Sequence, residues 1–308
     1  MNPEVRIIEP GQMEKPMGEI RFLFLPSRDL FAHRAGRLRL LSRGHTLGDY
    51  LAFLAMLADA QQDALGRFPQ LPLPDLNEQA FCRERCVPLL GVRSRRRDPA
   101  WREGLAMILQ RLRVYALPPA ASETIAHLMQ AGESALEETA DRILAGDLTD
   151  ISPQELPFVG AALQVYWVHT ASSLGEDAFG RPEHGGLCPV CGSPPVVGIV
   201  HGGGREQGLR YLSCSLCASL WHMVRITCSN CESTHGIDYY TLEGTNGAVK
   251  AESCDSCNSY LKLLYLGTDP QMEATADDLT TLALDMLMDQ EGKTRRGPNL
   301  FFHPGAPH

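Results

Sequence analysis

The sequence predicts a protein of α and small-β class, with a multi-helix N-terminal domain, two tandem four-cysteine metal modules and a C-terminal helix. Three observations support this prediction. Before the first cysteine pair, apolar residues recur at helical spacing, without an alternating pattern long enough for a strand. Eight of the ten cysteines form four C-x-x-C pairs. A further helical pattern, over residues 276–290, follows the last pair.

The helical domain is expected over residues 1–180. Asp98 is placed to cap a helix whose first position is Pro99, and Gly44 is placed to end an earlier helix. Six or seven helices are expected, including segments that start at Pro26–Ser27, cover 49–67, 81–87 and 98–115, start at Ser122, and run from Ser152–Pro153 to about Leu174. The glycine- and proline-rich stretch 175–192 marks the expected domain boundary.

The four cysteine pairs belong to an internal duplication. Cys191 and Cys214 are 23 positions apart, and so are Cys231 and Cys254. An offset of 40 residues relates all eight cysteines and also pairs Ser193 with Ser233, Gly204 with Gly244, and Ser213 with Ser253. One module is therefore repeated, with expected bounds of 181–225 and 226–268. Residues 269–308 are expected to form the C-terminal helix and an extended tail.

The C-x-x-C spacing suits a tetrahedral metal site built from thiolates. Two intervening residues form a tight turn that directs both sulfurs to one point, and a β-hairpin brings two such turns together. The expected hairpin strands are 196–200 with 209–213, and 237–242 with 248–253. The predicted ligand sets are Cys188, Cys191, Cys214 and Cys217 in the first module, and Cys228, Cys231, Cys254 and Cys257 in the second.

The spacing leaves several alternatives open. A crossed arrangement, in which the first pair joins the third, is possible but would make the equal spacings a coincidence. Four thiolates suit zinc and iron equally. Four protein ligands leave no open position, so a structural role is favoured over catalysis, with electron transfer and metal relay as alternatives. Cys82 and Cys86, four positions apart, are interpreted as core or partly buried thiols.

Charge and composition exclude several classes of function. The formal net charge is −9, and residues 188–257 carry four basic and six acidic side chains, so nucleic-acid binding is not expected. No apolar run reaches the roughly 18 residues of a membrane span. The N-terminus lacks a secretory pattern, so a cytoplasmic location is expected. The run Arg93, Arg95, Arg96 and Arg97 is interpreted as a solvated loop or as a docking site for an acidic partner segment.

The chain also lacks the common catalytic motifs. It contains no H-E-x-x-H, no G-x-S-x-G, no phosphate-binding G-x-x-x-x-G-K and no dinucleotide-binding glycine pattern after a strand. We therefore assign no catalytic residues, and we do not expect the protein to be an enzyme.

The cysteine motifs and their flanking segments together resemble the FdhE proteins, bacterial accessory factors needed to form active formate dehydrogenase. The flanking segments are LFAHRAGRLRLLSRGHTLGDYLAFLAMLADAQQDAL and ADDLTTLALDMLMDQEGKTRRGPN. Between them lie CPVCGSPPVVGIV, YLSCSLCASLWH, RITCSNCEST and ESCDSCNSYLK. The cysteine pairs alone would be shared with many zinc ribbons and rubredoxins, so the combination carries the resemblance, which covers nearly the whole chain.

The resemblance implies a cytoplasmic protein, not itself an enzyme, that binds the catalytic subunit of a formate dehydrogenase during maturation and before export. It implies rubredoxin-like (zinc-ribbon-like) modules in which the eight cysteines hold two mononuclear ions, with iron expected and zinc possible. Two other functions remain alternatives: a rubredoxin-like redox protein acting on the partner's cofactor, and a nucleic-acid-binding zinc-ribbon protein. No membrane partner is expected, and the sequence leaves self-association open.

Overall fold

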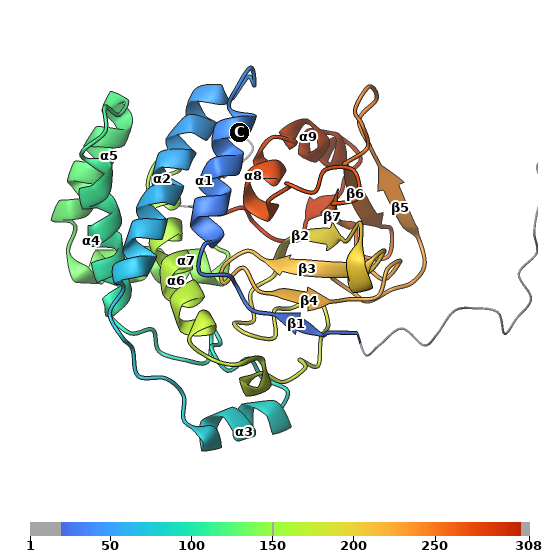
Figure 1. Cartoon of the computed structure of the whole chain (residues 1–308). Coiled ribbons are helices and arrows are strands. Elements are labelled where there is room, and N and C mark those ends of the chain that lie inside the picture. Colours follow the sequence, from blue (N-terminus) through green and yellow to red (C-terminus); the bar gives the residue numbers. More distant parts are fainter. Residues whose placement is uncertain (1–19, 150, 303–308) are drawn as a thin grey trace, which may run out of the picture.

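The fold consists of a layer of helices packed beside one mixed β-sheet (Figure 1). It comes from a computed structural model that describes residues 20–149 and 151–302. The helices of the first part are α1 (Leu30–Leu41), α2 (Gly48–Arg67), α3 (Leu76–Glu84), α4 (Ala100–Leu112), α5 (Pro119–Gln130), α6 (Glu133–Ala145) and α7 (Leu156–Ser172). The predicted fold class, helices followed by a four-cysteine sheet region, is confirmed.

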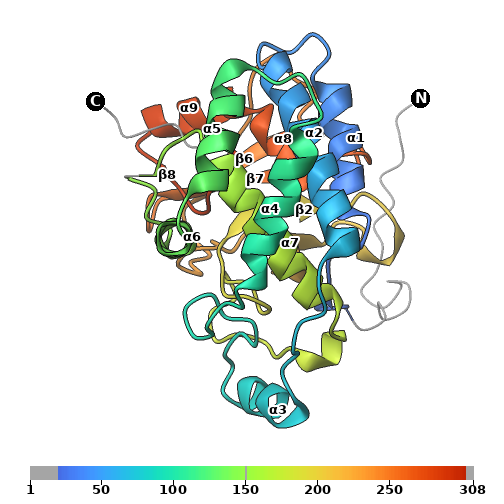
Figure 2. The same ribbon diagram turned by 90° about the vertical axis from the view of Figure 1, so that its left-hand side faces the viewer.

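Helix α7 is the centre of the helical part. It is apolar on all sides, and nearly all of its residues are buried, as expected for a helix surrounded by other elements. Helices α2, α4 and α6 pack against it, and α1 packs on α2. Helix α3 differs from the others, because it buries none of its residues and stands apart from the helical layer (Figure 2).

Several helical boundaries differ from the sequence prediction, most of all in the third helix and in the segment predicted from Ser122. The third helix begins at Leu76 instead of residue 81, because the Asp75 carboxylate caps it and accepts from the Glu78 N–H at 2.8 Å. The segment predicted from Ser122 is two helices, α5 and α6, separated where Ala131 and Gly132 adopt extended backbone angles. Among the described residues, no helix is long and apolar enough to cross a membrane.

The sheet is assembled from the two cysteine repeats. Its strands are β1 (Leu23–Phe24), β2 (Pro195–Val200), β3 (Arg210–Cys214), β4 (Leu220–His222), β5 (Ile237–Tyr240), β6 (Val249–Cys254), β7 (Ser259–Tyr265) and β8 (Thr294–Arg295). Their order is β1-β4-β3-β2-β7-β6-β5, with β8 beside β7. Two short 3₁₀ turns, Glu176–Ala178 and Gly204–Glu206, lie in the connections.

Each repeat is a three-stranded antiparallel unit, β2-β3-β4 in the first and β5-β6-β7 in the second. The predicted hairpins are therefore present, and each gains a third strand that the sequence prediction lacked. A parallel β2–β7 pairing joins the two units, with Gly198 opposite Leu263. A Cβ at Gly198 would lie 2.5 Å from Leu263 Cδ2, so a larger residue here would require the Leu263 side chain to move.

A buried ion pair also joins the repeats. Arg210 on β3 pairs with Glu252 on β6, and both side chains are almost fully buried. The Arg210 Nη2 donates to the carbonyls of Val224 and Thr227, 2.6 and 2.8 Å away, in the segment between the repeats. Glu252 also accepts from the Tyr239 hydroxyl at 2.9 Å. One guanidinium group thus holds the connecting segment and both three-stranded units of the sheet.

The C-terminal segment closes the structure. The helix predicted over 276–290 is two helices, α8 (Ala274–Leu279) and α9 (Leu282–Gln290). They are separated at Thr281, whose hydroxyl donates to the Asp277 and Asp278 carbonyls. Leu300 and Phe301, in the segment expected to be an extended tail, are buried in the main core. Residues 303–308 lie outside the described part, and the predicted domain bounds at 180, 225 and 268 stay a prediction.

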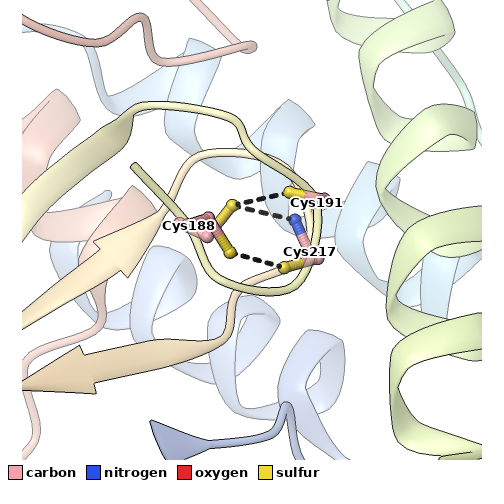
Figure 3. A group of neighbouring side chains, drawn as sticks. Cys188, Cys191 and Cys217 are labelled. Atoms are coloured by element: carbon pink, nitrogen blue, oxygen red, sulfur yellow. Dashed lines mark hydrogen bonds between the residues drawn. The ribbon is translucent and has the colours of Figure 1, made fainter. Parts of the chain in front are cut away.

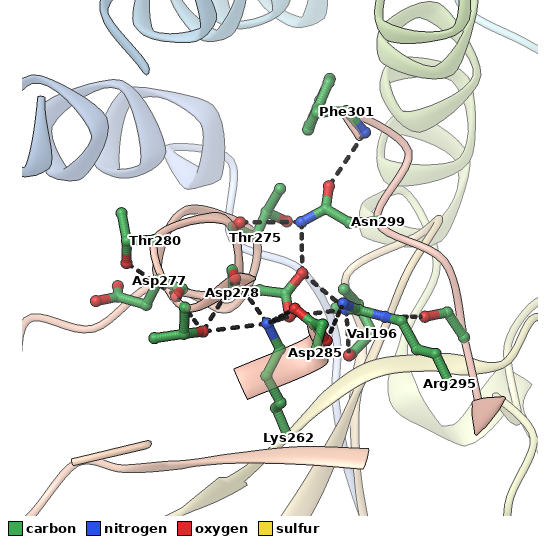
Figure 4. A network of polar contacts seen from close by, with 12 residues as sticks. Val196, Lys262, Thr275, Asp277, Asp278, Thr280, Asp285, Arg295, Asn299 and Phe301 are labelled. Atoms are coloured by element: carbon green, nitrogen blue, oxygen red, sulfur yellow. Dashed lines mark hydrogen bonds and ion pairs between the residues drawn. The ribbon is translucent and has the colours of Figure 1, made fainter. Parts of the chain in front are cut away.

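A buried polar network anchors α8 and α9 to the sheet (Figure 4). Asp278 is fully buried and lies 2.7 Å from Lys262 Nζ and 2.7 Å from Arg295 Nη2. Its carboxylate also accepts from Asn299 Nδ2 at 2.8 Å. Burial alone would raise the pKa of Asp278, but the two cations outweigh this effect and lower it.

We predict that Asp278→Asn lowers the free energy of unfolding at pH 7 by roughly 3 kcal/mol, because it removes one of the two carboxylates, Asp278 and Asp285, that pair with the buried Lys262 and the half-buried Arg295. Urea denaturation would measure this loss. Asp289→Asn, the same change on the exposed face of α9, should have no measurable effect. Equal losses in both variants would contradict the assigned role of Asp278.

The difference in unfolding free energy between the wild type and Asp278→Asn should depend on pH in a definite direction. The folded-state pKa of Asp278 is lowered, so its contribution is fully present above the unfolded-state pKa of about 3.9 and is lost as the pH falls through the folded-state value. The stability gap between the wild type and Asp278→Asn should therefore be constant above about pH 5 and narrow below about pH 4.

Candidate metal centres

The eight predicted cysteines meet in two groups of four. The first cluster is Cys188, Cys191, Cys214 and Cys217, and the second cluster is Cys228, Cys231, Cys254 and Cys257. Within each cluster all sulfur atoms lie within 4.8 Å of one another. The predicted grouping by repeat is confirmed, and the crossed arrangement of the first pair with the third is excluded.

The sulfur separations match those of a tetrahedral metal site. The distance between sulfurs is 3.5 Å for Cys188 and Cys217, and 3.4 Å for Cys191 and Cys214. The corresponding distances in the second cluster are 3.6 and 3.7 Å. A regular tetrahedron with metal–sulfur bonds of about 2.3 Å has edges of about 3.8 Å, whereas a disulfide is about 2.05 Å long. The donor sets therefore fit a four-thiolate ion, and all eight cysteines are free.

Each C-x-x-C turn is completed by one left-handed residue directly after its second cysteine. These four residues are Gly192, Ala218, Glu232 and Asn258, with φ of +77°, +56°, +60° and +52°. In the first turn of each repeat the backbone bonds are also the same. The Gly192 N–H donates to the Cys188 carbonyl at 2.8 Å, and the Glu232 N–H donates to the Cys228 carbonyl at 3.0 Å. Four turns of the same geometry thus direct their sulfurs inward.

Serine residues repeat around the sulfurs at the same 40-residue offset. The Ser193 carbonyl accepts from the Cys188 N–H, and the Ser233 carbonyl accepts from the Cys228 N–H. The hydroxyls of Ser219 and Ser259 lie 3.3 and 3.0 Å from the sulfurs of Cys217 and Cys257. Backbone N–H groups also point at the thiols, such as that of Leu216 at the Cys214 sulfur. These donors suit thiolate ligands, whose negative charge they would stabilise.

The first cluster is sealed between the sheet and the helical part. All four of its cysteines are buried, and Figure 3 shows sulfurs from both of its turns converging beside the helices. The loop after α3 covers it, since Leu90 and Val92 donate backbone N–H bonds to the carbonyls of Val190 and Cys191 at 2.9 and 3.0 Å. From α7, Trp167 Nε1 donates to the Leu90 carbonyl at 3.0 Å.

A buried glutamine connects the first cluster to the rest of the core. Gln164 on α7 donates to the Ser215 carbonyl, inside the second C-x-x-C turn, at 2.9 Å. Its amide oxygen accepts from Arg34 of α1 at 2.8 Å. Arg34 in turn pairs with Glu273 before α8 at 3.0 Å, and both of these side chains are buried. The first cluster is therefore bonded directly to α7, and through Gln164 and Arg34 it is linked to α1 and to the segment before α8.

The second cluster is more open than the first. Cys228 and Cys254 are buried, but Cys257 is half-buried and Cys231 is exposed. The Arg296 guanidinium lies close enough to Cys228 and Cys257 for electrostatic interaction, and burial is the main cause that lowers the pKa of Arg296. Its Nε atom is buried without a hydrogen-bond partner. A cation thus lies beside the cluster, where four thiolates would carry negative charge.

Without a cation the thiols of one cluster cannot all ionise. Burial raises the pKa of Cys188 and of Cys214 well above the usual thiol range. Burial also opposes ionisation of Cys191 and Cys257, but hydrogen bonds from neighbouring side chains lower both pKa values, that of Cys257 to about 6. Within each cluster, therefore, some thiols ionise readily and the others stay protonated. A bound positive ion would allow all four thiols to ionise and become ligands.

The other residues singled out from the sequence lie elsewhere. Cys82 is half-buried and Cys86 is exposed, and neither joins a cluster. The expectation of a buried or partly buried thiol thus holds for Cys82 and is wrong for Cys86. The sequence did not predict that the loop containing Leu90 and Val92 covers the first cluster, because no motif in this loop indicates that contact. It also missed the third strands, which the repeated Ser219 and Ser259 could have indicated.

The chain matches known proteins over nearly its whole length. Three family profiles, described as "FdhE, N-terminal", "FdhE, central domain" and "FdhE, C-terminal domain", match residues 20–182, 187–225 and 226–302. The "Protein FdhE homolog" of Pseudomonas aeruginosa is 42% identical over 307 residues, covering 97% of this chain and 98% of that protein. The homolog of Edwardsiella ictaluri is 43% identical, covering 94% of each.

A solved structure is also similar. The crystal structure of the FdhE protein from Pseudomonas aeruginosa has a TM-score of 0.83 at 41% identity, covering 93% of this chain and 100% of that one. The helical part, the sheet and the two cysteine clusters therefore belong to a fold that has been determined for a relative.

The left-handed turn residues lead to a pair of opposed predictions. Gly192→Ala should lower the free energy of unfolding by about 1–2 kcal/mol, because an L residue is strained at φ +77° and its Cβ would meet Pro88 at 3.3 Å. Ala218→Gly should leave stability unchanged or raise it by about 0.5 kcal/mol, because it relieves the same strain at the cost of backbone entropy. Urea denaturation of matched preparations would measure both. Equal destabilisation by both changes would contradict the assigned turn geometry.

Proposed function

Because this chain belongs to the FdhE family, we propose that it is an accessory factor required for formation of active formate dehydrogenase. In this proposal it binds the catalytic subunit of the enzyme in the cytoplasm, during maturation and before export, and is not itself an enzyme. The observation that carries the proposal is family membership across all three matched segments. The buried first cluster supports it, because a sealed four-thiol site offers no open position for a substrate.

We also propose that the eight cysteines hold two mononuclear ions, one in each cluster. The sulfur separations and the pKa directions support this assignment. Iron is the ion expected from the family, and zinc fits the same donors. Either ion would cross-link the two turns of its cluster, and iron could in addition carry an electron.

A second candidate function is electron transfer to the partner's cofactor. The exposure of Cys231 favours it, because this thiol brings the second cluster to the surface where a partner could approach. The nucleic-acid alternative has no comparable support, since the chain carries a net charge of −9.

Deletion of the gene tests the main proposal. Formate dehydrogenase activity should be lost in the deletion strain and restored by the wild-type gene, and the isolated catalytic subunit carrying its export signal should bind the purified protein. Activity that is unchanged by the deletion would overturn the proposal. Full complementation by zinc-loaded protein would remove the redox candidate and leave the accessory role in place.

The difference in burial predicts unequal release of the two ions. A chelator should remove one ion rapidly from the second cluster, where Cys231 is exposed, and the other slowly from the buried first cluster. Metal content by mass spectrometry should fall from two ions per chain to one in Cys231→Ser, with loss of the rapid phase. Cys191→Ser should also retain one ion but lose the slow phase and become less soluble.

Cys86→Ser is the matched control, because Cys86 is exposed and lies outside both clusters. It should keep two ions and both phases of release. Two ions retained in Cys191→Ser, or a rapid phase that persists in Cys231→Ser, would show the ligand assignment to be wrong.

A further inference from the structure

A surface hollow lies beside the arginine run and is separate from both cysteine clusters. It has a volume of about 270 Å³. Leu71, Pro72 and Trp167 supply apolar lining, and Arg95, Arg96 and Arg97 supply positive charge. A hollow that combines apolar surface with a few converging polar groups is typical of a binding site.

The arginines of this region are only partly neutralised. Arg95 pairs with Glu78 of α3, and Arg97 pairs with Glu137 and Asp141. The Arg97 side chain is 7% exposed, and its Nε donor is buried without a partner. Arg93 and Arg96 are exposed and make no ion pair within the described residues. Residues 71–99 carry six arginines and four acidic residues, in a chain of net charge −9, so this region would attract carboxylates.

Helix α3 lies beside the hollow, because its Glu78 pairs with Arg95 of the lining. Leu76 and Phe81 are 79% and 57% exposed, and Leu73 and Val87, just outside the helix, are also exposed. The Arg95–Glu78 ion pair ties the helix to the arginine run. An isolated nine-residue helix is marginal in water and gains stability mainly by burying an apolar face. Helix α3 buries none of its residues within this chain, so its exposed apolar side chains are available to a partner.

We propose that the hollow and α3 together form a docking surface for an acidic segment of a partner protein. Carboxylates of the segment would pair with Arg93 and Arg96, and its apolar side chains would lie against Leu76 and Phe81. Arginine is suited to this contact because its guanidinium binds a carboxylate through two parallel hydrogen bonds. The partner is the catalytic subunit named above, so the inference rests on the proposed function.

Equilibrium binding of the full-length protein to the isolated catalytic subunit tests the charged half of the surface. Arg93→Glu/Arg96→Glu should weaken binding at least about tenfold, equivalent to about 1.4 kcal/mol, and should reduce its salt dependence. Arg43→Glu is the matched control, because Arg43 is exposed and without an ion pair in the described structure. It precedes the first residue of α2, whereas Leu71 and Pro72 of the hollow follow the last. This control should leave the dissociation constant unchanged within about twofold.

The apolar half is tested by Leu76→Ser/Phe81→Ser, with Met286→Ser on α9 as the control, since Met286 is 66% exposed. Binding should weaken about tenfold in the first variant only. Circular dichroism and metal content should be unchanged in every variant, because all of these side chains are on the surface. Unchanged binding by both double variants overturns the docking surface while the proposed function stands.

Two other outcomes separate the remaining explanations. Failure of the wild-type protein to bind the subunit would overturn the proposed function and this inference with it. If the wild type self-associates and Arg93→Glu/Arg96→Glu abolishes that association without changing subunit binding, the surface belongs to a second copy of this chain and the inference is wrong. Sedimentation analysis of the same variants would distinguish these results.

Discussion

The sheet half of this protein depends on holding four cysteine sulfurs within 4.8 Å of one another, twice. Thiolates repel at this distance, and buried thiols resist ionisation, so the arrangement needs fixed turns and a positive charge. The turns are provided by left-handed residues such as Gly192 and Glu232 at corresponding positions of the repeats. These turns also determine where the strands lie, because strands of each antiparallel unit begin or end at a C-x-x-C turn. The local backbone is thus organised around the sulfurs.

A module of about 40 residues has too little apolar surface to be stable alone, and the two repeats reach stability by different means. The first is built into the main hydrophobic core, where Trp221 and Leu212 belong to the same buried cluster as residues of α7. The second also contributes Leu261 and Leu263 to this core, and it is held in addition by buried charge, with Arg210 on one side and the Lys262–Asp278 pair on the other. Such ion pairs contribute less to the free energy of folding than apolar packing does. Any other alignment of the two repeats would, however, leave a buried charge without its partner, which is costly. The duplicated sequence therefore produces two sites in unlike environments.

The cysteine clusters could be predicted from the sequence because their signal is local and repeated. Spacing alone grouped Cys188 with Cys217 and Cys228 with Cys257, and the offset of 40 residues paired Ser193 with Ser233. Helices were predictable where apolar periodicity is long, as in α2. Contacts between distant segments could not be predicted, because neither partner shows a pattern by itself. The β2–β7 pairing, the strand at Leu23–Phe24 and the cover at Leu90 belong to this class.

The loop between α3 and α4 links the proposed docking surface to the first cluster. Its backbone donates to the carbonyls of Val190 and Cys191, and Trp167 both lines the hollow and holds Leu90. A partner segment seated in the hollow would therefore rest on residues that contact the first cysteine turn. Four ligands around one ion restrict the positions of Val190 and Cys191, and so of the loop bonded to them. The buried first cluster can thus serve partner recognition without touching the partner, which is consistent with its complete burial.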